Sequence, residues 1–221
     1  MPQQVYLSEE FLAQEEARIF HKEWLCAGRE DDIPEVGDFI TYHIGRQPII
    51  VVRLSDRSIH AMANVCRHRM MRLVEGRGNA KRFACPYHGW TYRIDGQLIG
   101  APHMECTAEF DKKQLILPEI RCETWGGWIY VTLNPEAESV ADRLHDLESV
   151  VAKYRMENYV GIFSEDHEWN TNWKLLCENF MEGLHLPVAH RSTVGQDFPV
   201  QDTIFDSGGA FDGFTLSLIH I

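Results

Sequence analysis

Two pairs of cysteine and histidine, each confined to a few consecutive positions, are the feature of this sequence best suited to chemistry. Cys66 and His68 form the first pair in C-R-H, and Cys85 and His88 form the second in C-P-Y-H. Sixteen residues separate the two pairs. Thiolates and neutral imidazoles both bind metal ions, and two tight loops lying side by side can hold a metal group between them. The sequence therefore predicts a metal site built from these four residues.

Two thiols and two imidazoles suit a [2Fe–2S] cluster that has a different ligand pair on each iron. Two thiolates stabilise one ferric iron, and two neutral imidazoles in place of thiolates at the other iron remove negative charge and raise the reduction potential. The alternative is a Cys2His2 zinc site, which accepts the same ligand types. The spacing C-x-H followed by C-x2-H is not that of a zinc finger, so the cluster is preferred.

The residues beside the second pair favour a tightly turned and shielded site. Pro86 and Gly89 are residue types typical of a tight turn. Trp90 and Tyr92 provide aromatic cover, which would limit the access of solvent to a cluster.

Residues 85–102, CPYHGWTYRIDGQLIGAP, and the C-x-H pair before them are similar to the Rieske domain of ring-hydroxylating oxygenase α subunits. The resemblance covers about residues 20–135. It implies a [2Fe–2S] cluster on Cys66, His68, Cys85 and His88 and a mononuclear non-heme Fe(II) elsewhere in the subunit. It also implies NAD(P)H-derived electrons delivered by a reductase or a ferredoxin, and O2-dependent hydroxylation of an aromatic ring or an N-methyl group of a small-molecule substrate. The complete subunit is expected to form a homotrimer.

Two other classes of Rieske protein compete with this interpretation. The Rieske subunits of quinol-oxidising complexes carry a disulfide that braces the cluster, and the positions of its two cysteines hold Met71 and Tyr87 here. A Rieske ferredoxin, which only carries electrons, needs little beyond the β-rich block, whereas this chain continues for about 85 residues after it. Pure electron transfer is kept as the alternative function.

A second group of residues, in ENFMEGLHLPVAH at positions 178–190, indicates an iron site. Glu182 and His185 are three residues apart, so both are expected on one side of a single helix spanning residues 172–184. His190 follows Pro187 and can join them only where the helix breaks. Two imidazoles and one carboxylate from elsewhere would complete a 2-His-1-carboxylate triad with open positions for oxygen.

The resemblance to the oxygenase family assigns roles within this second group. It implies that His185 and His190 bind the mononuclear iron. It also implies that Glu182 connects a cluster histidine of one subunit to an iron-binding histidine of its neighbour, and is therefore the catalytic residue of the group. Many ring dioxygenases have Asp at this position, and Glu resembles the branch that demethylates quaternary amines.

The rest of the sequence predicts the elements that position these residues. Helical spacing indicates helices over residues 8–24 and 139–155. Residues rich in β-branched and aromatic side chains indicate strands over 39–45, 48–54, 58–65 and 128–133, with hairpin turns at Gly45-Arg46, Asp56-Arg57 and Asp95-Gly96. The remaining four cysteines, Cys26, Cys106, Cys122 and Cys177, have no ligand spacing and are expected to be small buried residues.

The predicted fold is a mainly β Rieske domain followed by the N-terminal part of an α+β catalytic domain. The expected boundaries are an N-terminal helix at 1–24, the Rieske domain at 25–135 and the start of the catalytic domain at 136–221. The net charge of −12 disfavours nucleic acid and anionic membranes as partners. Neither a signal peptide nor a run of about 18 apolar residues is found, so a cytoplasmic location is expected.

The sequence is also expected to be a C-terminally truncated fragment. The family places its third iron ligand, an Asp, more than one hundred residues after the second histidine, and only 31 residues follow His190. Asp197, Asp202, Asp206 and Asp212 are the remaining carboxylates, and none lies at a fitting distance along the chain.

Overall fold

The computed structural model describes residues 2–104, 107–165, 167–197, 203–207 and 212–216 of the 221-residue chain. The chain divides into two compact units. One unit consists of Ala13–Val140 and Arg155–Phe163, and the other consists of Met1–Leu12, Ala141–Tyr154 and Ser164–Ile221. The fold class agrees with the prediction, because a β-rich unit carries the Cys–His pairs and a unit of helices and short strands follows.

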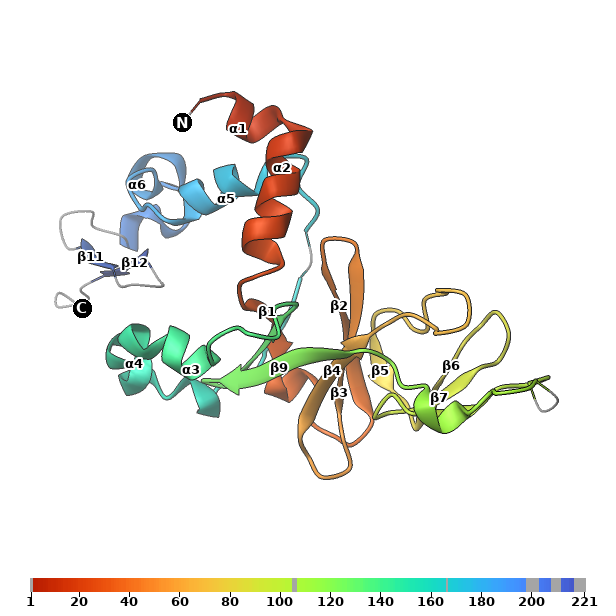
Figure 1. The fold of residues 1–221 in the computed structure, drawn as a ribbon. Coiled ribbons are helices and arrows are strands. Elements are labelled where there is room, and N and C mark those ends of the chain that lie inside the picture. The colour runs from red at the N-terminus through yellow and green to blue at the C-terminus, as the bar shows by residue number, and fades with distance from the viewer. Residues whose placement is uncertain (1, 105–106, 166, 198–202, 208–211, 217–221) are drawn as a thin grey trace. The chain divides into compact units, whose positions relative to one another are not determined.

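An antiparallel sheet of seven strands forms the larger part of the β-rich unit (Figure 1). Its order is β1-β10-β9-β4-β3-β2-β5. The strands are β1 (Leu25–Arg29), β2 (Asp38–Ile44), β3 (Gln47–Arg53), β4 (Ile59–Ala63), β5 (Arg77–Asn79), β9 (Glu119–Trp125) and β10 (Trp128–Thr132). The four strands predicted from the sequence are therefore confirmed as β2, β3, β4 and β10. The predicted turn at Gly45-Arg46 is also confirmed, because Ile44 pairs directly with Gln47.

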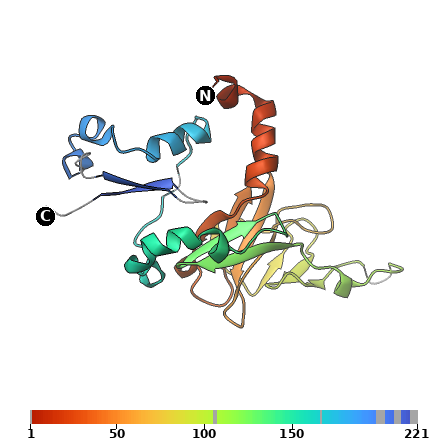
Figure 2. The same cartoon turned by 60° about the vertical axis from the view of Figure 1, so that its left-hand side comes forward.

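A second, three-stranded antiparallel sheet carries one of the two Cys–His pairs on its first hairpin. It consists of β6 (Arg82–Ala84), β7 (Thr91–Arg93) and β8 (Leu98–Gly100). The small sheet is seen from a second side in Figure 2. Short helical turns η2 (Glu30–Asp32) and η3 (Lys112–Gln114) lie between strands of this unit.

Strand β3 is buried on both faces, which explains its uninterrupted apolar sequence. Ile50 and Val52 point into a core that also contains Cys66, Cys85 and the small sheet, whereas Ile49 and Val51 point into a core with β1 and β10. All four of these β3 side chains are fully buried. The first core places the two cysteines of the Cys–His pairs against well-packed apolar residues, which fixes the loops that carry them.

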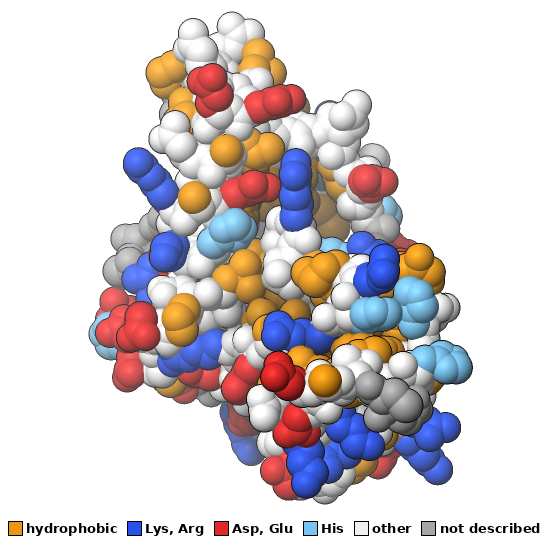
Figure 3. Space-filling model, turned by 45° about the vertical axis from the view of Figure 1, so that its right-hand side comes forward, with side chains coloured by type: hydrophobic (Ala, Val, Ile, Leu, Met, Phe, Trp, Pro, Cys, Tyr) orange, Lys and Arg blue, Asp and Glu red, His pale blue; other side chains and the backbone are white. Residues whose placement is uncertain are grey.

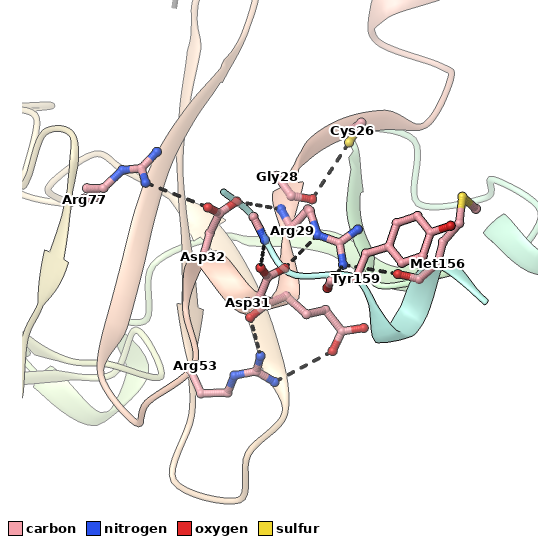
Figure 4. Close-up of polar contacts among 11 residues, drawn as sticks. Cys26, Gly28, Arg29, Asp31, Asp32, Arg53, Arg77, Met156 and Tyr159 are labelled. Carbon is pink, nitrogen blue, oxygen red and sulfur yellow. Dashed lines mark hydrogen bonds and ion pairs between the residues drawn. The ribbon is translucent and has the colours of Figure 1, made fainter. Parts of the chain in front are cut away.

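A polar network holds the segment after β10 against the start of the β-rich unit (Figure 4). The Arg29 guanidinium donates to the Asp31 carboxylate at 2.7 Å and to the Tyr159 carbonyl at 2.7 Å. Asp31 in turn accepts from the Gly161 N–H at 2.6 Å. Residues 155–163, which include the turn η5 (Met156–Asn158), are therefore part of the β-rich unit although they follow helices of the other unit.

The N-terminal helix is less regular than its sequence predicts. It consists of α1 (Gln4–Leu7), α2 (Glu9–Glu15) and a π-helical turn η1 (Glu16–Phe20), and it ends before residue 24. The Ser8 hydroxyl accepts from the Phe11 N–H, in agreement with its predicted capping role.

The other unit is built mainly from short helices. They are α3 (Val140–Arg143), α4 (His145–Val151), α5 (Trp173–Phe180) and α6 (Leu186–Ala189), with turns η4 (Ala152–Tyr154) and η6 (Val194–Asp197). The strands β11 (Thr203–Ser207) and β12 (Asp212–Leu216) pair as a hairpin. The predicted helix 139–155 is thus interrupted after Arg143, and the predicted helix 172–184 ends at Phe180.

The N-terminal residues pack against α5 within this unit. The Asn172 side chain caps α5 by accepting from the Lys174 N–H, and its amide donates to the Tyr6 carbonyl at 2.9 Å. The Tyr6 hydroxyl donates to Glu178 at 2.8 Å. The Lys174 ammonium lies over the rings of Tyr6, Phe11 and Trp173 at 5.3–5.6 Å. Residues far apart in the sequence therefore fix the helix that leads to Glu182.

The prediction that four cysteines are buried is wrong for two of them. Cys26 and Cys177 are exposed, because they point outward from β1 and α5, respectively. Cys122 is half-buried on β9, and burial raises its pKa to about 12. Cys106 lies outside the described residues.

Candidate metal centre

The two Cys–His loops share one pattern of backbone hydrogen bonds. In the first loop, the Cys66 N–H donates to the Met71 carbonyl at 2.8 Å, and the Met70 N–H donates to the Cys66 carbonyl at 3.0 Å. In the second loop, the Cys85 N–H donates to the Trp90 carbonyl at 2.7 Å, and the Gly89 N–H donates to the Cys85 carbonyl at 3.0 Å. Each cysteine is thus bonded to the residues four and five positions later.

The similarity extends to the left-handed residue that closes each loop. Met70 has a φ of 57° and Gly89 has a φ of 69°. Glycine adopts this conformation without strain, which agrees with the turn predicted at Gly89. Methionine adopts this conformation at a cost, so its residue type does not predict that Met70 closes an equivalent turn. The histidine of each pair lies within its closed loop.

The two thiols lie at the buried end of this site. Cys66 is fully buried and Cys85 is 4% exposed. Burial, together with the neighbouring Cys85, raises the pKa of the Cys66 thiol. A hydroxyl from the small sheet reaches the same sulfur, because the Tyr92 oxygen lies 3.4 Å from Cys66 Sγ. That oxygen also accepts from the Arg67 N–H at 3.0 Å. A thiolate that binds iron carries no hydrogen, so in a cluster the phenol would donate to the sulfur.

The two imidazoles lie together at the outer end of the site. The centroids of the His68 and His88 rings are 4.6 Å apart. The His68 ring stacks on Trp90 with a centroid distance of 4.8 Å and an interplanar angle of 8°. Burial and the nearby His88 lower the pKa of His68, which favours the neutral imidazole that binds metals. His88 is exposed.

The His68 Nδ1 atom tests whether these residues fit a metal group. It is buried and has no hydrogen-bond partner among the described residues. A buried ring nitrogen without a partner is unfavourable unless something else binds it. An iron ion would bind that nitrogen. The two buried thiols of the same site supply the thiolates, which are the other ligand type of a Rieske cluster. The residues therefore fit the group.

The structure places Glu182, His185 and His190 around a break between helices. The expectation that Glu182 and His185 share one helical face is wrong, because α5 ends at Phe180 and Gly183 follows in the connection. His185 is the N-cap of α6, and His190 is its C-cap. Pro187 is accommodated because it occupies the first turn of α6, where no N–H is needed.

Two of the three side chains are joined directly. The Glu182 carboxylate bonds the Nδ1 atom of His185, and this hydrogen bond lowers the pKa of Glu182. The Nε2 atom of His185 is left available, as in metal sites where a carboxylate orients a metal-binding histidine. The centroids of the His185 and His190 rings are 5.3 Å apart. No group of three or more His, Cys, Asp or Glu side chains in the described part of the chain could hold one metal ion.

The carboxylates considered as a third ligand cannot be placed. Asp202 lies outside the described residues. Asp197, Asp206 and Asp212 lie in described turns or strands, but their side chains lie outside the described part.

Comparison with known families gives two matches along the chain. Residues 23–111 match the Rieske [2Fe-2S] domain, and residues 145–214 match the catalytic domain of the ring-hydroxylating α subunit. The chain therefore combines a Rieske domain with catalytic-domain sequence of a ring-hydroxylating α subunit. Domains of these two kinds use a [2Fe–2S] cluster and a mononuclear iron, respectively.

Individual relatives act on two kinds of substrate. The chain is 39% identical over 191 residues to the glycine betaine monooxygenase oxygenase subunit of Pseudomonas aeruginosa. The aligned region covers 86% of this chain and 44% of that protein. It is 35% identical over 185 residues to the anthranilate 1,2-dioxygenase large subunit of Acinetobacter baylyi, covering 80% and 39%, respectively. A quaternary ammonium Rieske monooxygenase solved with L-carnitine superposes with a TM-score of 0.86 at 26% identity, covering 94% of this chain and 59% of that one.

The chain spans about half the length, or less, of these curated relatives. No helix within the described ranges has the length and apolar character needed to cross a membrane.

Proposed function

We propose that this chain provides the Rieske centre and two iron-binding histidines of an oxygenase that hydroxylates an N-methyl group of a quaternary amine. The observation that carries this proposal is the pair of matching loops that brings two buried thiols to one end of a site and two imidazoles to the other. Hydroxylation of an aromatic ring is the second candidate, because the anthranilate dioxygenase subunit is also a relative.

Cys66 and Cys85 would hold one iron of the cluster, and His68 and His88 would hold the other. Burial of the two thiols keeps water from the sulfur ligands, and the Tyr92 hydroxyl stabilises negative charge on Cys66 Sγ. Trp90 fixes the orientation of the His68 ring by stacking on it. The exposed His88 leaves an imidazole edge of the site open to a group from outside the unit.

His185 and His190 would hold the mononuclear iron, which supplies the O2 chemistry of the reaction when it is bound. The role of Glu182 follows from its hydrogen bond to His185. It holds the proton on Nδ1 and directs Nε2 toward the metal. Its second carboxylate oxygen accepts from the Leu184 N–H and keeps a further lone pair for a group from outside the unit. We assign it as the residue that links the two metal centres across subunits.

The remaining proposals concern organisation and partners. The domain boundaries are placed at 1–24 for the N-terminal helix, 25–135 for the Rieske domain and 136–221 for the catalytic portion. The partners are a reductase or ferredoxin that supplies electrons from NAD(P)H, a small-molecule substrate, and two further copies in a homotrimer. The quaternary amine is preferred as substrate because the glycine betaine enzyme is the relative with 39% identity and because Glu occupies position 182.

Metal analysis tests the first part of the proposal against the zinc alternative. The chain, expressed with iron and sulfide supply, should be red-brown and should contain acid-labile sulfide. Cys85→Ser should abolish the colour because it removes a buried ligand, whereas the matched change Cys26→Ser at an exposed cysteine should leave it intact. A colourless wild-type protein with stoichiometric zinc would reject the cluster.

Product analysis tests the second part, using the full gene product with both metal centres loaded. Hydroxylation of an N-methyl carbon yields a carbinolamine that releases formaldehyde, so glycine betaine or carnitine should give formaldehyde that depends on O2 and on electrons. Glu182→Gln should keep both metals bound and stop this release. Anthranilate turnover without formaldehyde from either amine would favour the ring-hydroxylating candidate, and normal turnover by the variant would refute the role of Glu182.

A further inference from the structure

The two Cys–His loops differ in how their ends are joined. The second loop is closed by the β6–β7 hairpin, whose consecutive residue pairs lead directly into it. The first loop, which carries Cys66 and His68, follows β4 and precedes β5, and in the sheet these two strands are separated by β3 and β2. Within the described part of the chain, its ends meet in one isolated pair, Val65 with Arg72. Strand pairing therefore closes the first loop less firmly than the second.

A buried asparagine at the start of the first loop supplies bonds that strand pairing does not. Asn64 directly follows β4, and its side chain is fully buried. Its amide oxygen accepts from the Leu73 N–H at 3.1 Å and from the Val74 N–H at 3.2 Å. Its amide nitrogen donates to the Val74 carbonyl at 2.8 Å. The side chain thus satisfies the backbone groups of these two residues as a neighbouring strand would, and it joins the two ends of the loop.

The backbone of Asn64 is itself held by the large sheet. Its N–H donates to the Pro48 carbonyl of β3 at 2.9 Å. The preceding N–H, that of Ala63, donates to the Pro118 carbonyl at 2.8 Å. Strand β3 is buried on both faces, so the Asn64 side chain ties the far end of the first loop to a well-packed part of the β-rich unit.

The first loop needs this support because its own conformation is unfavourable. Met70 closes it with a φ of 57°, a left-handed backbone that is costly for any residue with a side chain. The outer side chains offer little compensation, since Met70 is 76% exposed and Arg67 and Arg69 are exposed as well. Charged and histidine side chains also stand at the surface of the face seen in Figure 3. Exposed side chains contribute little to stability, so the loop is held from its buried base.

We propose that Asn64 is a positioning residue that fixes the geometry with which Cys66 and His68 bind the proposed cluster. The inference rests on the proposed function, because that function assigns Cys66 and His68 as ligands. Asn64 acts through the backbone of the loop whose ends it joins. Such support matters because a metal ligand has to be held within about 0.5 Å of its productive position. A buried polar group with all its hydrogen bonds made specifies one arrangement of the groups around it.

A residue that only stabilises the fold and a residue that positions ligands differ in what Asn64→Leu changes. The variant leaves the N–H groups of Leu73 and Val74 without this acceptor, so both roles predict lower stability. The positioning role alone predicts altered coordination in molecules that remain folded. Thr132→Val is the matched control, because Thr132 is 1% exposed on β10 and its hydroxyl accepts from the Asn134 N–H at 3.1 Å, outside both loops.

The test compares these proteins with their clusters loaded and with each protein held equally far below its own thermal midpoint. In Asn64→Leu, pulsed electron paramagnetic resonance should show a changed coupling for one of the two histidine nitrogens. Release of iron to a ferrous chelator should be about tenfold faster, since hydrogen bonds at the buried base of the loop are lost. Hydrogen exchange of the amides in residues 64–74 should also be faster. Thr132→Val should keep both couplings, the release rate and the exchange of these amides at their wild-type values.

A second background covers the case in which Asn64→Leu alone does not fold. Met70→Gly removes the cost of the left-handed backbone at an exposed position, so Asn64→Leu is then compared with Asn64 in that background and should show the same change of coupling.

Each outcome bears on either the positioning role or the centre itself. Unchanged couplings and release in a folded Asn64→Leu protein, or the same changes in Thr132→Val, would overturn the positioning role alone. Failure of Asn64→Leu to fold in both backgrounds would assign Asn64 to the fold and would overturn it as well. A wild-type protein with no dithionite-reducible centre would remove the proposed function and this inference with it.

Discussion

Replacement of Tyr92 by phenylalanine isolates the effect of one hydroxyl on the proposed cluster. Tyr92 is fully buried, and its oxygen lies 3.4 Å from Cys66 Sγ and 3.0 Å from the Arg67 nitrogen. Burial and the hydrogen bond to Cys66 raise the pKa of Tyr92, so the phenol keeps its proton at any working pH. Since a thiolate that binds iron carries no hydrogen, the phenol would be the donor to the sulfur in the cluster. Tyr92→Phe removes this donor and little volume.

The expected effect follows from the charge that reduction adds to the cluster. A hydrogen bond to a charged acceptor contributes about 1.5–3 kcal/mol, and part of this stabilisation is already present in the oxidised cluster. A difference of about 1 kcal/mol between the two oxidation states corresponds to a shift of about 40 mV for one electron. Because the donor stabilises the more negative state, Tyr92→Phe should lower the reduction potential by about this amount.

Protein-film voltammetry on the holoprotein measures this shift directly. Tyr42→Phe is the matched control, because Tyr42 is a half-buried tyrosine on β2 and its hydroxyl bonds none of the proposed ligands in the described structure. The control should keep the wild-type potential and the wild-type cluster content. An unchanged or raised potential in Tyr92→Phe, with the cluster intact, would show that the hydroxyl does not donate to the cluster sulfur.

Three further substitutions test the packing and electrostatics of the two units. Trp90→Ala removes a 4%-exposed side chain stacked on His68, and it should lower the free energy of unfolding by about 3–5 kcal/mol in urea titrations. Asn172→Ala removes the N-cap of α5 and should cost about 1 kcal/mol by the same measurement, whereas an unchanged midpoint would show that the cap contributes nothing. The hydrogen bond from the Gly161 N–H lowers the pKa of Asp31 below its ordinary value of 3.8. The ionised carboxylate therefore stabilises the folded state above pH 3.8. This contribution to the free energy of unfolding is lost as the pH falls through the lowered pKa. Asp31→Asn should therefore be less stable than wild type near neutral pH, with the difference shrinking at acidic pH, and a constant difference would contradict the shift.

The sequence predicted the β-rich unit well because its signals are local. The strands around Gly45-Arg46 combine β-branched runs with a two-residue turn, and each signal alone already restricts the structure. The ligands of the proposed cluster were found for a similar reason, since the chemistry requires fixed residue types at short spacing. The buried Nδ1 atom of His68, which has no hydrogen-bond partner among the described residues, agrees with that assignment, although no sequence pattern predicts it.

Features that depend on tertiary contacts were predicted less well. The residues Met181-Glu182-Gly183 continue the helical pattern, yet α5 ends at Phe180, and the Glu182 carboxylate bonds His185 across the break. Hydrophobic periodicity does not show that a side-chain hydrogen bond can compete with continuation of the helix. The turn at Met70 is also not predicted, because no sequence pattern indicates a methionine whose backbone has a positive φ.

Pulsed electron paramagnetic resonance of the dithionite-reduced chain identifies the ligands of the proposed cluster, because it detects nuclei bound to the cluster. The protein is prepared with isotope-labelled histidine, and the label identifies which nitrogens couple to the unpaired electron. A cluster on these four residues should give a Rieske-type signal with two directly coupled histidine nitrogens, and His68→Cys should lose one of them. A reduced protein without a signal, or a signal with no coupled histidine nitrogen, would contradict the assignment of Cys66, His68, Cys85 and His88.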